Sequence, residues 1–520
     1  MSRARTKQVC TIGPATADKI PDLVAGGMDV ARINFSHGSD DDHKAYVHAV
    51  RAAAHSARRS VAVMADLPGP KLRLGDLAGG ELRLSDGATF MLLAEGRVQP
   101  LAVSQAATVA DSELPTESTG SEAPVEPANV ALARDESETQ PDTTAHVAAL
   151  ATPGAIVRGA QLAAVLQVGD RVLMADGAVE LNVTDVADGQ VTTDVVSGGL
   201  IRSRSGVNIP SERFGDGGVT DDDRAGVLRA LELRVDLLAQ SYVRSAADVL
   251  ALRALLPTDG PRVVAKIETR AAVDDFHAIC AAADGIMVAR GDLGVDIPFE
   301  DVPMIQKDLV RRATSAGRFS IVATQMLESM ISAALPTRAE ASDVANAVLD
   351  GADAVMLSAE TAIGAHPVEA LKAMERICRA AEQHVGASEA TAPEPSVAIT
   401  LAATMMAATS GVGAIWCFTR TGRTAELLSL QRPSVPIVAF TLSPVVARRL
   451  AVRRGVVPLV LPAGAKNVPL NDQMEAAWRA QRSATADIDS VLLVTTSSQP
   501  GGINRLEFHR LSAAATAKRA

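Results

Sequence analysis

The sequence predicts an α/β protein built on a (β/α)8 TIM barrel, with an inserted small all-β lid domain and a C-terminal doubly wound α/β domain. Three observations carry this prediction. Eight short apolar runs alternate with helical patterns, a long segment between the third and fourth runs switches to period-two alternation, and a second strand–helix alternation begins near residue 385.

The predicted barrel strands are near-continuous apolar runs that end in polar residues. Strands of this kind are typical of a parallel sheet that is covered on both faces, and eight of them fit a closed barrel. They are Gln8–Gly13, Asp29–Phe35, Ser60–Leu67, Val235–Tyr242, Arg262–Glu268, Gly285–Arg290, Ser320–Gln325 and Ala354–Glu360.

The gap between Leu67 and Val235 is too long for a connection and contains alternating segments such as ELRLSDGATFML. We expect a β domain there, which divides the chain into barrel (1–75), lid (76–214), barrel (215–385) and C-terminal domain (386–520). Within the lid, residues 104–147 hold nine acidic residues and one basic residue and no aromatic residue. This composition predicts a disordered acidic insertion.

Composition excludes several classes of function. A net charge of −11 with 2% aromatic residues argues against nucleic-acid binding. No long apolar stretch predicts a membrane span, and no signal peptide is expected. The four cysteines are scattered without a CxxC pair, which suits the reducing cytoplasm.

The polar ends of the predicted strands form a candidate site, because chemistry in such a barrel belongs at the C-terminal ends of its strands. Glu268 and Asp292 are two carboxylates that could hold one Mg²⁺, which takes one or two protein carboxylates plus water and substrate oxygens. Arg32 and Lys266 supply positive charge for a phosphoryl group. Together these residues indicate phosphoryl transfer with little acid–base work by the protein.

Long motifs make the chain resemble pyruvate kinase over nearly its full length. The matching segments are KQVCTIGPAT, GMDVARINFSHGS, DLPGPKLR, SGVNIP, AKIET, DGIMVARGDLGVDIP, ATQMLESMI and PTRAEASDVANAVLDGADAVMLSAETA. The resemblance implies transfer of a phosphoryl group from phosphoenolpyruvate to ADP, giving pyruvate and ATP. It also implies a barrel, a mobile lid and a regulatory C-terminal domain, usually in a homotetramer.

The resemblance also implies roles for residues. Glu268 and Asp292 hold the Mg²⁺ that phosphoenolpyruvate binds, and a second Mg²⁺ arrives with ADP. Lys266 stabilises charge on the phosphoryl group and the enolate, and Arg32 contacts the phosphoryl group. Gly291 and Asp292, with Thr324, position the substrate carboxylate, and Thr324 lies where the enolate is protonated. The nucleotide side is implied to hold Asn34, His37 and Arg73. The alternative for His37 is that it caps the following helix together with Ser36 and Ser39.

One departure from the family concerns the monovalent cation. In K⁺-dependent members the third-strand motif reads DTKGPEIR, whereas this chain reads DLPGPKLR and places Lys71 where those members have Glu. A fixed ammonium group could replace K⁺, so we expect that K⁺ is not required. The residues of the monovalent-cation pocket remain in place: Asn34, Ser36, Asp66 and the carbonyl of Leu67.

The lid and the C-terminal domain depart further. The lid has IRSRSGVNIP in place of a lysine-rich stretch, which puts its contacts to ADP in doubt. In the C-terminal domain, a phosphate-binding loop at a helix N-terminus is predicted, and its residues are Thr419, Thr421, Gly422, Arg423 and Thr424. The second effector loop, TTSSQPGGINRL, lacks Trp, so the effector could be a sugar monophosphate or a nucleotide monophosphate rather than fructose 1,6-bisphosphate. An ordinary strand–helix turn is the other interpretation of the first loop.

Two other functions compete with an active kinase. A regulatory paralogue could bind phosphoenolpyruvate or a sugar phosphate and phosphorylate ADP poorly, and the altered lid is its support. A barrel enzyme with other enolate chemistry would need neither a lid nor an effector domain. The strand-end residues favour the kinase.

Overall fold

Eight parallel strands close into the predicted barrel, in the order β1-β17-β16-β15-β14-β13-β3-β2. The computed structural model describes residues 3–70, 72–94, 153–158, 162–175, 177–210, 213, 218–385, 395–462, 468–480, 488–495 and 505–511. The barrel strands are β1 (Lys7–Thr11), β2 (Val30–Asn34), β3 (Ala62–Asp66), β13 (Leu237–Gln240), β14 (Arg262–Ile267), β15 (Gly285–Ala289), β16 (Phe319–Ala323) and β17 (Ala354–Leu357).

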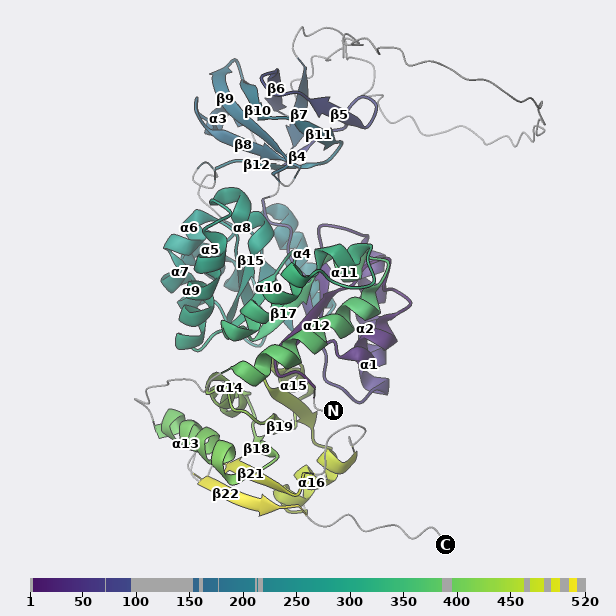
Figure 1. Ribbon diagram of the computed structural model, residues 1–520, viewed down its shortest axis with the longest axis vertical. Coiled ribbons are helices and arrows are strands. Elements are labelled where there is room, and N and C mark those ends of the chain that lie inside the picture. The colour runs from purple at the N-terminus through teal and green to yellow at the C-terminus, as the bar shows by residue number, and fades with distance from the viewer. Residues whose placement is uncertain are drawn as a thin grey trace, which may run out of the picture. The chain divides into compact units, whose positions relative to one another are not determined.

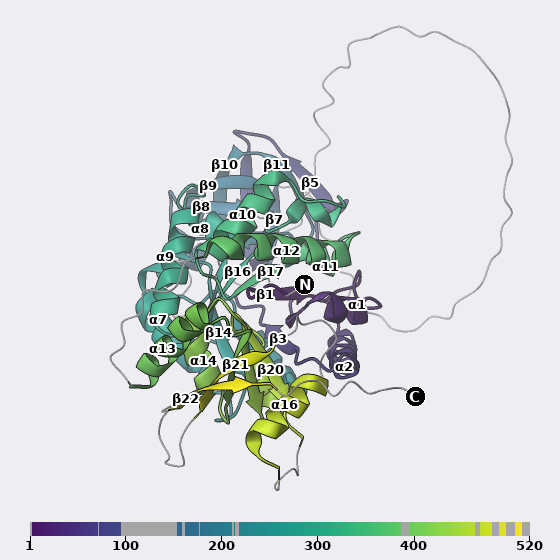
Figure 2. The ribbon, with the colours of Figure 1, turned by 60° about the horizontal axis from the view of Figure 1, so that its bottom comes forward.

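Helices surround these strands (Figures 1 and 2). They are α1 (Ile20–Gly26), α2 (Asp40–Ser56), α4 (Asp221–Glu232), α5 (Ala246–Arg253), α6 (Arg270–Asp274), α7 (Phe276–Ala282), α8 (Arg290–Asp296), α9 (Val302–Ser315), α10 (Arg338–Leu349), α11 (Ala359–Ala362) and α12 (Pro367–Ala381), with short 3-10 turns η2 (Glu328–Ile331) and η3 (Glu382–His384). One face of each strand packs against this helical layer. The side chains between strands and helices form the larger of the apolar clusters in the barrel.

The other face of each strand fills the barrel interior. Val30, Met64, Ala239 and Val264 belong to this inner cluster. Side chains two residues apart on a strand point to the same face. The inward face of β2, β3, β13 and β14 therefore continues toward the polar residues at the strand ends.

Residues 72–209 form a separate β unit. Seven of its strands close into a small barrel in the order β10-β6-β7-β4-β12-β8-β9, and two more pair as β11-β5. They are β4 (Leu72–Leu74), β5 (Glu81–Leu84), β6 (Thr89–Ala94), β7 (Gly154–Arg158), β8 (Arg171–Met174), β9 (Val179–Ala187), β10 (Gln190–Ser197), β11 (Gly199–Arg202) and β12 (Gly206–Asn208), with one short helix, α3 (Leu162–Val165). The acidic segment predicted at 104–147 lies outside the described residues.

The C-terminal domain has a five-stranded sheet in the order β20-β19-β18-β21-β22, in which only β22 is antiparallel to its neighbour among the described strands. Helices α13 and α14 pack on one face, and α16 packs on the other. This arrangement is the predicted doubly wound α/β fold. The elements are α13 (Pro395–Ser410), β18 (Ala414–Phe418), α14 (Arg423–Leu430), β19 (Ile437–Thr441), α15 (Pro444–Leu450), β20 (Val456–Val460), α16 (Leu470–Ala480), β21 (Ser490–Thr495) and β22 (Arg505–Arg510).

The C-terminal domain closes the N-terminal end of the barrel. Ala451 and Val452, which follow α15, belong to the apolar cluster inside the barrel. Next to them, the buried carboxylate of Asp353 pairs with Arg432 at 2.9 Å. Burial raises the pKa of this carboxyl, but Arg432 outweighs burial and holds the pKa below its ordinary value.

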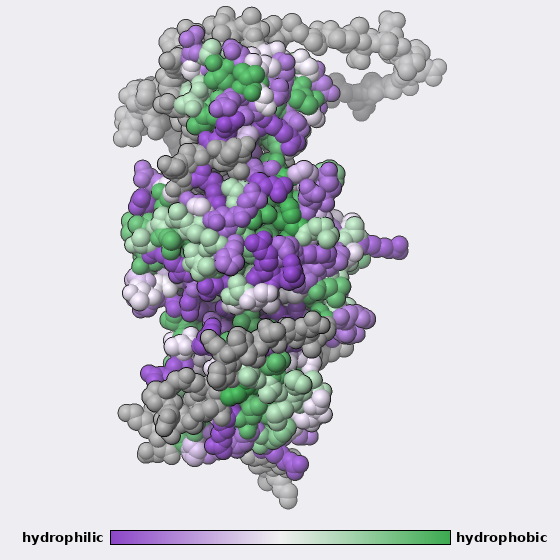
Figure 3. Space-filling view, turned by 90° about the vertical axis from the view of Figure 1, so that its left-hand side faces the viewer, coloured by the Kyte–Doolittle hydropathy of each residue, from purple (hydrophilic) through white to green (hydrophobic). Residues whose placement is uncertain are grey.

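The surface mixes polar and apolar residues. Figure 3 shows hydrophilic and hydrophobic side chains interspersed on the face of the barrel that it presents. Within the described part of the chain, no helix combines the length and the apolar character that a membrane span requires.

Candidate active site at the C-terminal ends of the barrel strands

Lys266 lies at the centre of a buried charged cluster. Its Nζ is 2.8 Å from Glu268 Oε1 and 3.3 Å from Asp66 Oδ1, and it donates a hydrogen bond of 2.8 Å to Ser241 Oγ. Val264 faces the barrel interior, so period-two alternation turns Lys266 and Glu268 inward as well. The strand pattern itself therefore brings the ammonium and the carboxylate together.

The ammonium group of Lys266 is held in its charged form. Burial lowers the pKa of Lys266, but the carboxylates of Asp66 and Glu268 outweigh burial and raise the pKa above its ordinary value. The group is therefore suited to stabilise negative charge rather than to act as a base near neutral pH.

Arg32 brings a second cation to the same place. Its Nε and Nη2 are each 2.7 Å from the same oxygen, Asp66 Oδ2, and its Nη1 donates to Thr11 Oγ1 at 3.0 Å. Asp66 thus lies between Arg32 and Lys266. A guanidinium fixed in this way can present its remaining N–H groups to a phosphoryl group.

Tyr242 links the two candidate metal ligands. Its backbone N–H donates to Glu268 Oε2 at 2.7 Å, and its hydroxyl donates to Asp292 Oδ1 at 3.4 Å. Tyr242 has a φ of +53°, an unusual conformation for a residue with a side chain. Glu268 and Asp292 are hard oxygen donors of the kind that Mg²⁺ prefers. Among the described residues, there is no group of three or more His, Cys, Asp or Glu side chains that could hold a metal.

Gly291 and Thr324 meet at the ends of β15 and β16. The Gly291 N–H donates to Thr324 Oγ1 at 2.7 Å, and the same hydroxyl donates to the Ala323 carbonyl at 2.6 Å. Gly291 belongs to the first turn of α8. Thr324 and Gln325 both have positive φ, +69° and +53°. The backbone is therefore strained directly after β16, as is common at functional sites.

Arg290 holds this strained turn in place. Its Nη2 donates to the Thr324 carbonyl at 2.6 Å, and its Nη1 lies 2.6 Å from both carboxylate oxygens of Asp343 on α10. These contacts occupy the guanidinium group. Arg290 therefore positions the turn that carries Thr324.

Asn34, Ser36 and His37 form a turn between β2 and α2. Asn34 Oδ1 accepts a hydrogen bond of 3.1 Å from the Ser36 N–H, and Asn34 Nδ2 lies 3.1 Å from His37 Nδ1. The cap of α2 is Ser39, which forms a capping box with Asp42. Of the three residues in the capping alternative, Ser39 is therefore the N-cap of α2.

Three further residues were predicted to lie near the site: Leu67, Lys71 and Arg73. The Leu67 carbonyl accepts a hydrogen bond of 2.7 Å from Ser241 Oγ. Lys71 lies outside the described residues. Arg73 belongs to β4 of the β unit, where its Nη1 donates to the Arg204 carbonyl at 3.1 Å.

Family comparisons agree with this geometry. The barrel domain of pyruvate kinase matches residues 3–100 and 143–371, and the pyruvate kinase alpha/beta domain matches residues 397–508. The chain belongs to the pyruvate kinase family. Members of this family are phosphotransferases that use a divalent metal, so the chain is assigned to the transferases.

Relatives of the pyruvate kinase family match along nearly the whole chain. A pyruvate kinase of Mycobacterium intracellulare is 38% identical over 98% of this chain and 99% of its own length. One from Agrobacterium vitis is 36% identical over 98% and 97%, and one from Geobacillus stearothermophilus is 35% identical over 98% and 81%. The barrel-domain match leaves residues 101–142 uncovered, and these residues fall almost entirely within the acidic segment at 104–147.

The predicted effector loop lies between β18 and α14. Gly422 is the N-cap of α14 with a φ of +100°, and its N–H donates to Thr419 Oγ1 at 2.9 Å. Thr421 and Arg423 are exposed, whereas Thr424 is buried. One N–H group of the turn is thus already satisfied within the chain, and the exposed side chains are the ones that could contact an effector.

Sequence analysis missed two residues of the candidate site. Ser241 and Tyr242 follow β13 and contact Lys266, Glu268 and Asp292. The signal was present, because the fourth apolar run ends in the polar pair Ser-Tyr just as the other runs end in polar residues.

Proposed function

We propose that the protein transfers the phosphoryl group of phosphoenolpyruvate to ADP, giving pyruvate and ATP, as the last step of glycolysis. The observation that carries the proposal is the buried cluster of Lys266, Arg32 and Asp66 beside Glu268. Two cations fixed by carboxylates at the mouth of a barrel provide the electrostatic stabilisation that phosphoryl transfer needs.

In this proposal Arg32 binds the phosphoryl group and Lys266 stabilises the charge that develops on the phosphoryl and enolate oxygens. Glu268 and Asp292 would hold Mg²⁺, which neutralises substrate charge when bound. Gly291, Asp292 and Thr324 together orient the substrate carboxylate. Thr324, through a water molecule, lies where the enolate carbon accepts a proton.

ADP is proposed to bind with its own Mg²⁺ near Asn34, His37 and Arg73. A sugar phosphate or nucleotide effector is proposed for the loop from Thr419 to Thr424. We also propose a homotetramer in the cytoplasm. The four cysteines, which are buried and free, suit a reducing compartment.

Replacing Gly291 by alanine is expected to raise the KM for phosphoenolpyruvate about tenfold or more without a change in thermal stability. A Cβ at this position would have its nearest neighbour, Thr324 Oγ1, at 3.5 Å, an ordinary contact distance. The fold therefore tolerates the methyl group, whereas a substrate carboxylate that lies against Gly291 would be displaced. Steady-state kinetics and a melting curve measure both effects, and an unchanged KM would contradict the role of Gly291.

We further propose that K⁺ is not required. Besides Lys71, the support is that Asp66 already has Arg32 and Lys266 as cationic partners and that the Leu67 carbonyl already accepts from Ser241. Pyruvate formation from phosphoenolpyruvate, ADP and Mg²⁺ should proceed at equal rates in K⁺, Na⁺ and tetramethylammonium. A large activation by K⁺ would reject this part of the proposal and leave the kinase activity intact.

The regulatory paralogue remains the second candidate. The lid favours this candidate. In the lid, Arg202 pairs with Glu81 and Arg204 pairs with Asp76, so neither arginine lacks a carboxylate partner that a nucleotide phosphate would replace. Binding of phosphoenolpyruvate by a folded protein with no turnover at any ADP concentration would select it over the kinase.

A further inference from the structure

Tyr242 contacts both candidate ligands of the divalent metal, through different groups. Its backbone N–H donates to Glu268 Oε2 at 2.7 Å, and its phenol hydroxyl donates to Asp292 Oδ1 at 3.4 Å. A single residue therefore holds one oxygen of each carboxylate. Residues that hold the ligands of a metal in this way influence which metal binds and how tightly it binds.

The surroundings of Tyr242 fix the place of its hydroxyl. Ser241 Oγ donates to the Leu67 carbonyl at 2.7 Å, which anchors the turn to the end of β3. A Cβ at Gly69 would lie only 3.2 Å from Tyr242 Cδ2, so the ring packs directly on the Gly69 backbone. The Gly69 N–H in turn donates to Asp223 Oδ1 at 3.0 Å. The ring therefore lies between an anchored turn and a fixed backbone.

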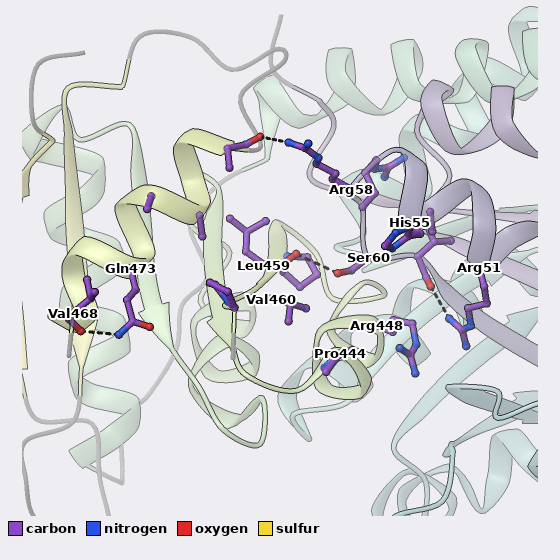
Figure 4. Close-up of a pocket in the computed structure, with 18 of the residues that line it drawn as sticks. Arg51, His55, Arg58, Ser60, Pro444, Arg448, Leu459, Val460, Val468 and Gln473 are labelled. Carbon is purple, nitrogen blue, oxygen red and sulfur yellow. Dashed lines mark hydrogen bonds between the residues drawn. The ribbon is translucent and has the colours of Figure 1, made fainter. Parts of the chain in front are cut away.

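The bonding of Asp292 differs from that of a carboxylate that stabilises the barrel. Both oxygens of Asp236 are paired, with Arg51 Nη2 at 2.7 Å from Oδ2 and Arg448 Nε at 2.8 Å from Oδ1. Figure 4 shows these two arginines near each other, one from α2 and one from α15. Asp292 is half-buried, and among the described residues no lysine or arginine pairs with it and its hydrogen bond comes from the neutral hydroxyl of Tyr242. Its carboxylate can therefore accept a metal cation.

The contacts of the two carboxylates limit how they can bind that cation. Glu268 Oε1 lies 2.8 Å from Lys266 Nζ, and Oε2 accepts from the Tyr242 N–H, so both oxygens already contact the protein. A cation that bound both oxygens of Asp292 would compete with the hydroxyl proton of Tyr242 for Oδ1. The hydroxyl contact is longer than a typical O–H···O hydrogen bond of about 2.7–2.8 Å, and a small movement of the Asp292 side chain is enough to shorten it.

Binding through single oxygens does not suit all divalent cations equally. Mg²⁺ needs a near-octahedral shell at roughly 2.0–2.1 Å and is usually held by one or two carboxylates with several waters. Ca²⁺ takes about six to eight oxygen ligands and accepts bidentate carboxylates. Loss of the bidentate mode therefore costs Ca²⁺ more than Mg²⁺.

We propose that the Tyr242 hydroxyl makes the metal site selective for Mg²⁺ over Ca²⁺ by restricting Asp292 to binding through one oxygen, an inference that rests on the metal site of the proposed function. Tyr242 is in this respect a positioning residue, because it acts on the metal through Asp292. Its N–H does the same for Glu268, and this backbone contact does not depend on the hydroxyl.

Competition against Mn²⁺ tests the proposal without turnover. Metal-free protein is loaded with Mn²⁺, Mg²⁺ or Ca²⁺ is added, and electron paramagnetic resonance measures the Mn²⁺ that is displaced. The quantity of interest is the ratio of the Kd for Ca²⁺ to the Kd for Mg²⁺. Tyr242→Phe keeps the ring and the backbone N–H and removes the hydroxyl. The ratio should fall about tenfold in this variant, because Ca²⁺ gains the second oxygen of Asp292 and Mg²⁺ does not.

Tyr46→Phe is the matched control. Tyr46 is the other tyrosine of the chain and lies on α2, in the outer helical layer. Its variant should keep the wild-type ratio, and melting curves establish that both variants fold. An unchanged ratio in Tyr242→Phe, or an equal change in Tyr46→Phe, would overturn the role of Tyr242 and leave the proposed function standing. A wild-type protein that binds no Mn²⁺ would overturn the metal site itself, and with it both this inference and the proposed function.

Discussion

Replacing Lys266 by methionine is expected to lower kcat for pyruvate formation by about 10²–10³-fold or more. The ammonium group lies 2.8 Å from Glu268 and 3.3 Å from Asp66, so it is a fixed positive charge between these two carboxylates. Methionine keeps the length of the side chain and removes the charge. Charge that develops on the phosphoryl and enolate oxygens then lacks its partner, so kcat should fall much more than the affinity for phosphoenolpyruvate changes.

Lys307→Met is the matched control for this prediction. Lys307 also pairs with a carboxylate, that of Asp350, but it lies on α9 in the outer helical layer. The kcat of the Lys307→Met variant should stay close to that of the wild type. Comparable losses in the two variants, measured as steady-state rates of folded protein, would show that the effect of Lys266 is one of stability and not of catalysis.

Replacing Glu268 by glutamine is expected to weaken divalent-metal binding by about 10–100-fold or more. The amide oxygen can still accept from the Tyr242 N–H, but the NH₂ group then faces the Lys266 ammonium, donor against donor. The metal loses a charged ligand, and Lys266 loses a counter-ion. Titration of the metal-free protein with Mn²⁺, followed by electron paramagnetic resonance, measures this binding without relying on turnover.

Glu360→Gln gives the comparison for Glu268. Glu360 is as deeply buried as Glu268, but its two oxygens accept from the backbone N–H groups of Leu327 and Ser358. Its loss should lower the melting temperature and leave Mn²⁺ affinity near the wild-type value. If Glu268→Gln retained wild-type affinity for Mn²⁺, the metal would have to be placed on other ligands.

Much of the barrel and its chemistry could be predicted because short contiguous segments of the sequence specify both. A strand buried on both faces is a continuous apolar run, and a residue such as Lys266 or Asp292 at its end stands out against that run. Closure of the barrel then brings these strand ends together without further information. The eight barrel strands and the cluster around Lys266 follow from this logic.

The parts that escaped prediction depend on contacts between distant segments. β4 and β7 are short, and they are defined by pairing with each other and with β12 and β6. β22 was not predicted, because RLEFHR carries little apolar character and becomes a strand only beside β21. Tyr242 was missed as a link between Glu268 and Asp292, because its positive φ directs its N–H and hydroxyl in ways that composition does not reveal.

Residues of the C-terminal domain close the N-terminal end of the barrel, which we call the barrel floor. This affects which truncations and domain exchanges the protein can tolerate. Ala451 and Val452 complete the apolar interior of the barrel, and Arg432 and Arg448 neutralise Asp353 and Asp236 at the strand ends. A fragment that stops before the C-terminal domain would leave Asp353 buried without Arg432, leave Asp236 with Arg51 alone, and leave the interior open to water. We therefore expect the barrel and the C-terminal domain to unfold as one cooperative unit, and a C-terminal domain exchanged between relatives would have to supply the residues that close the barrel.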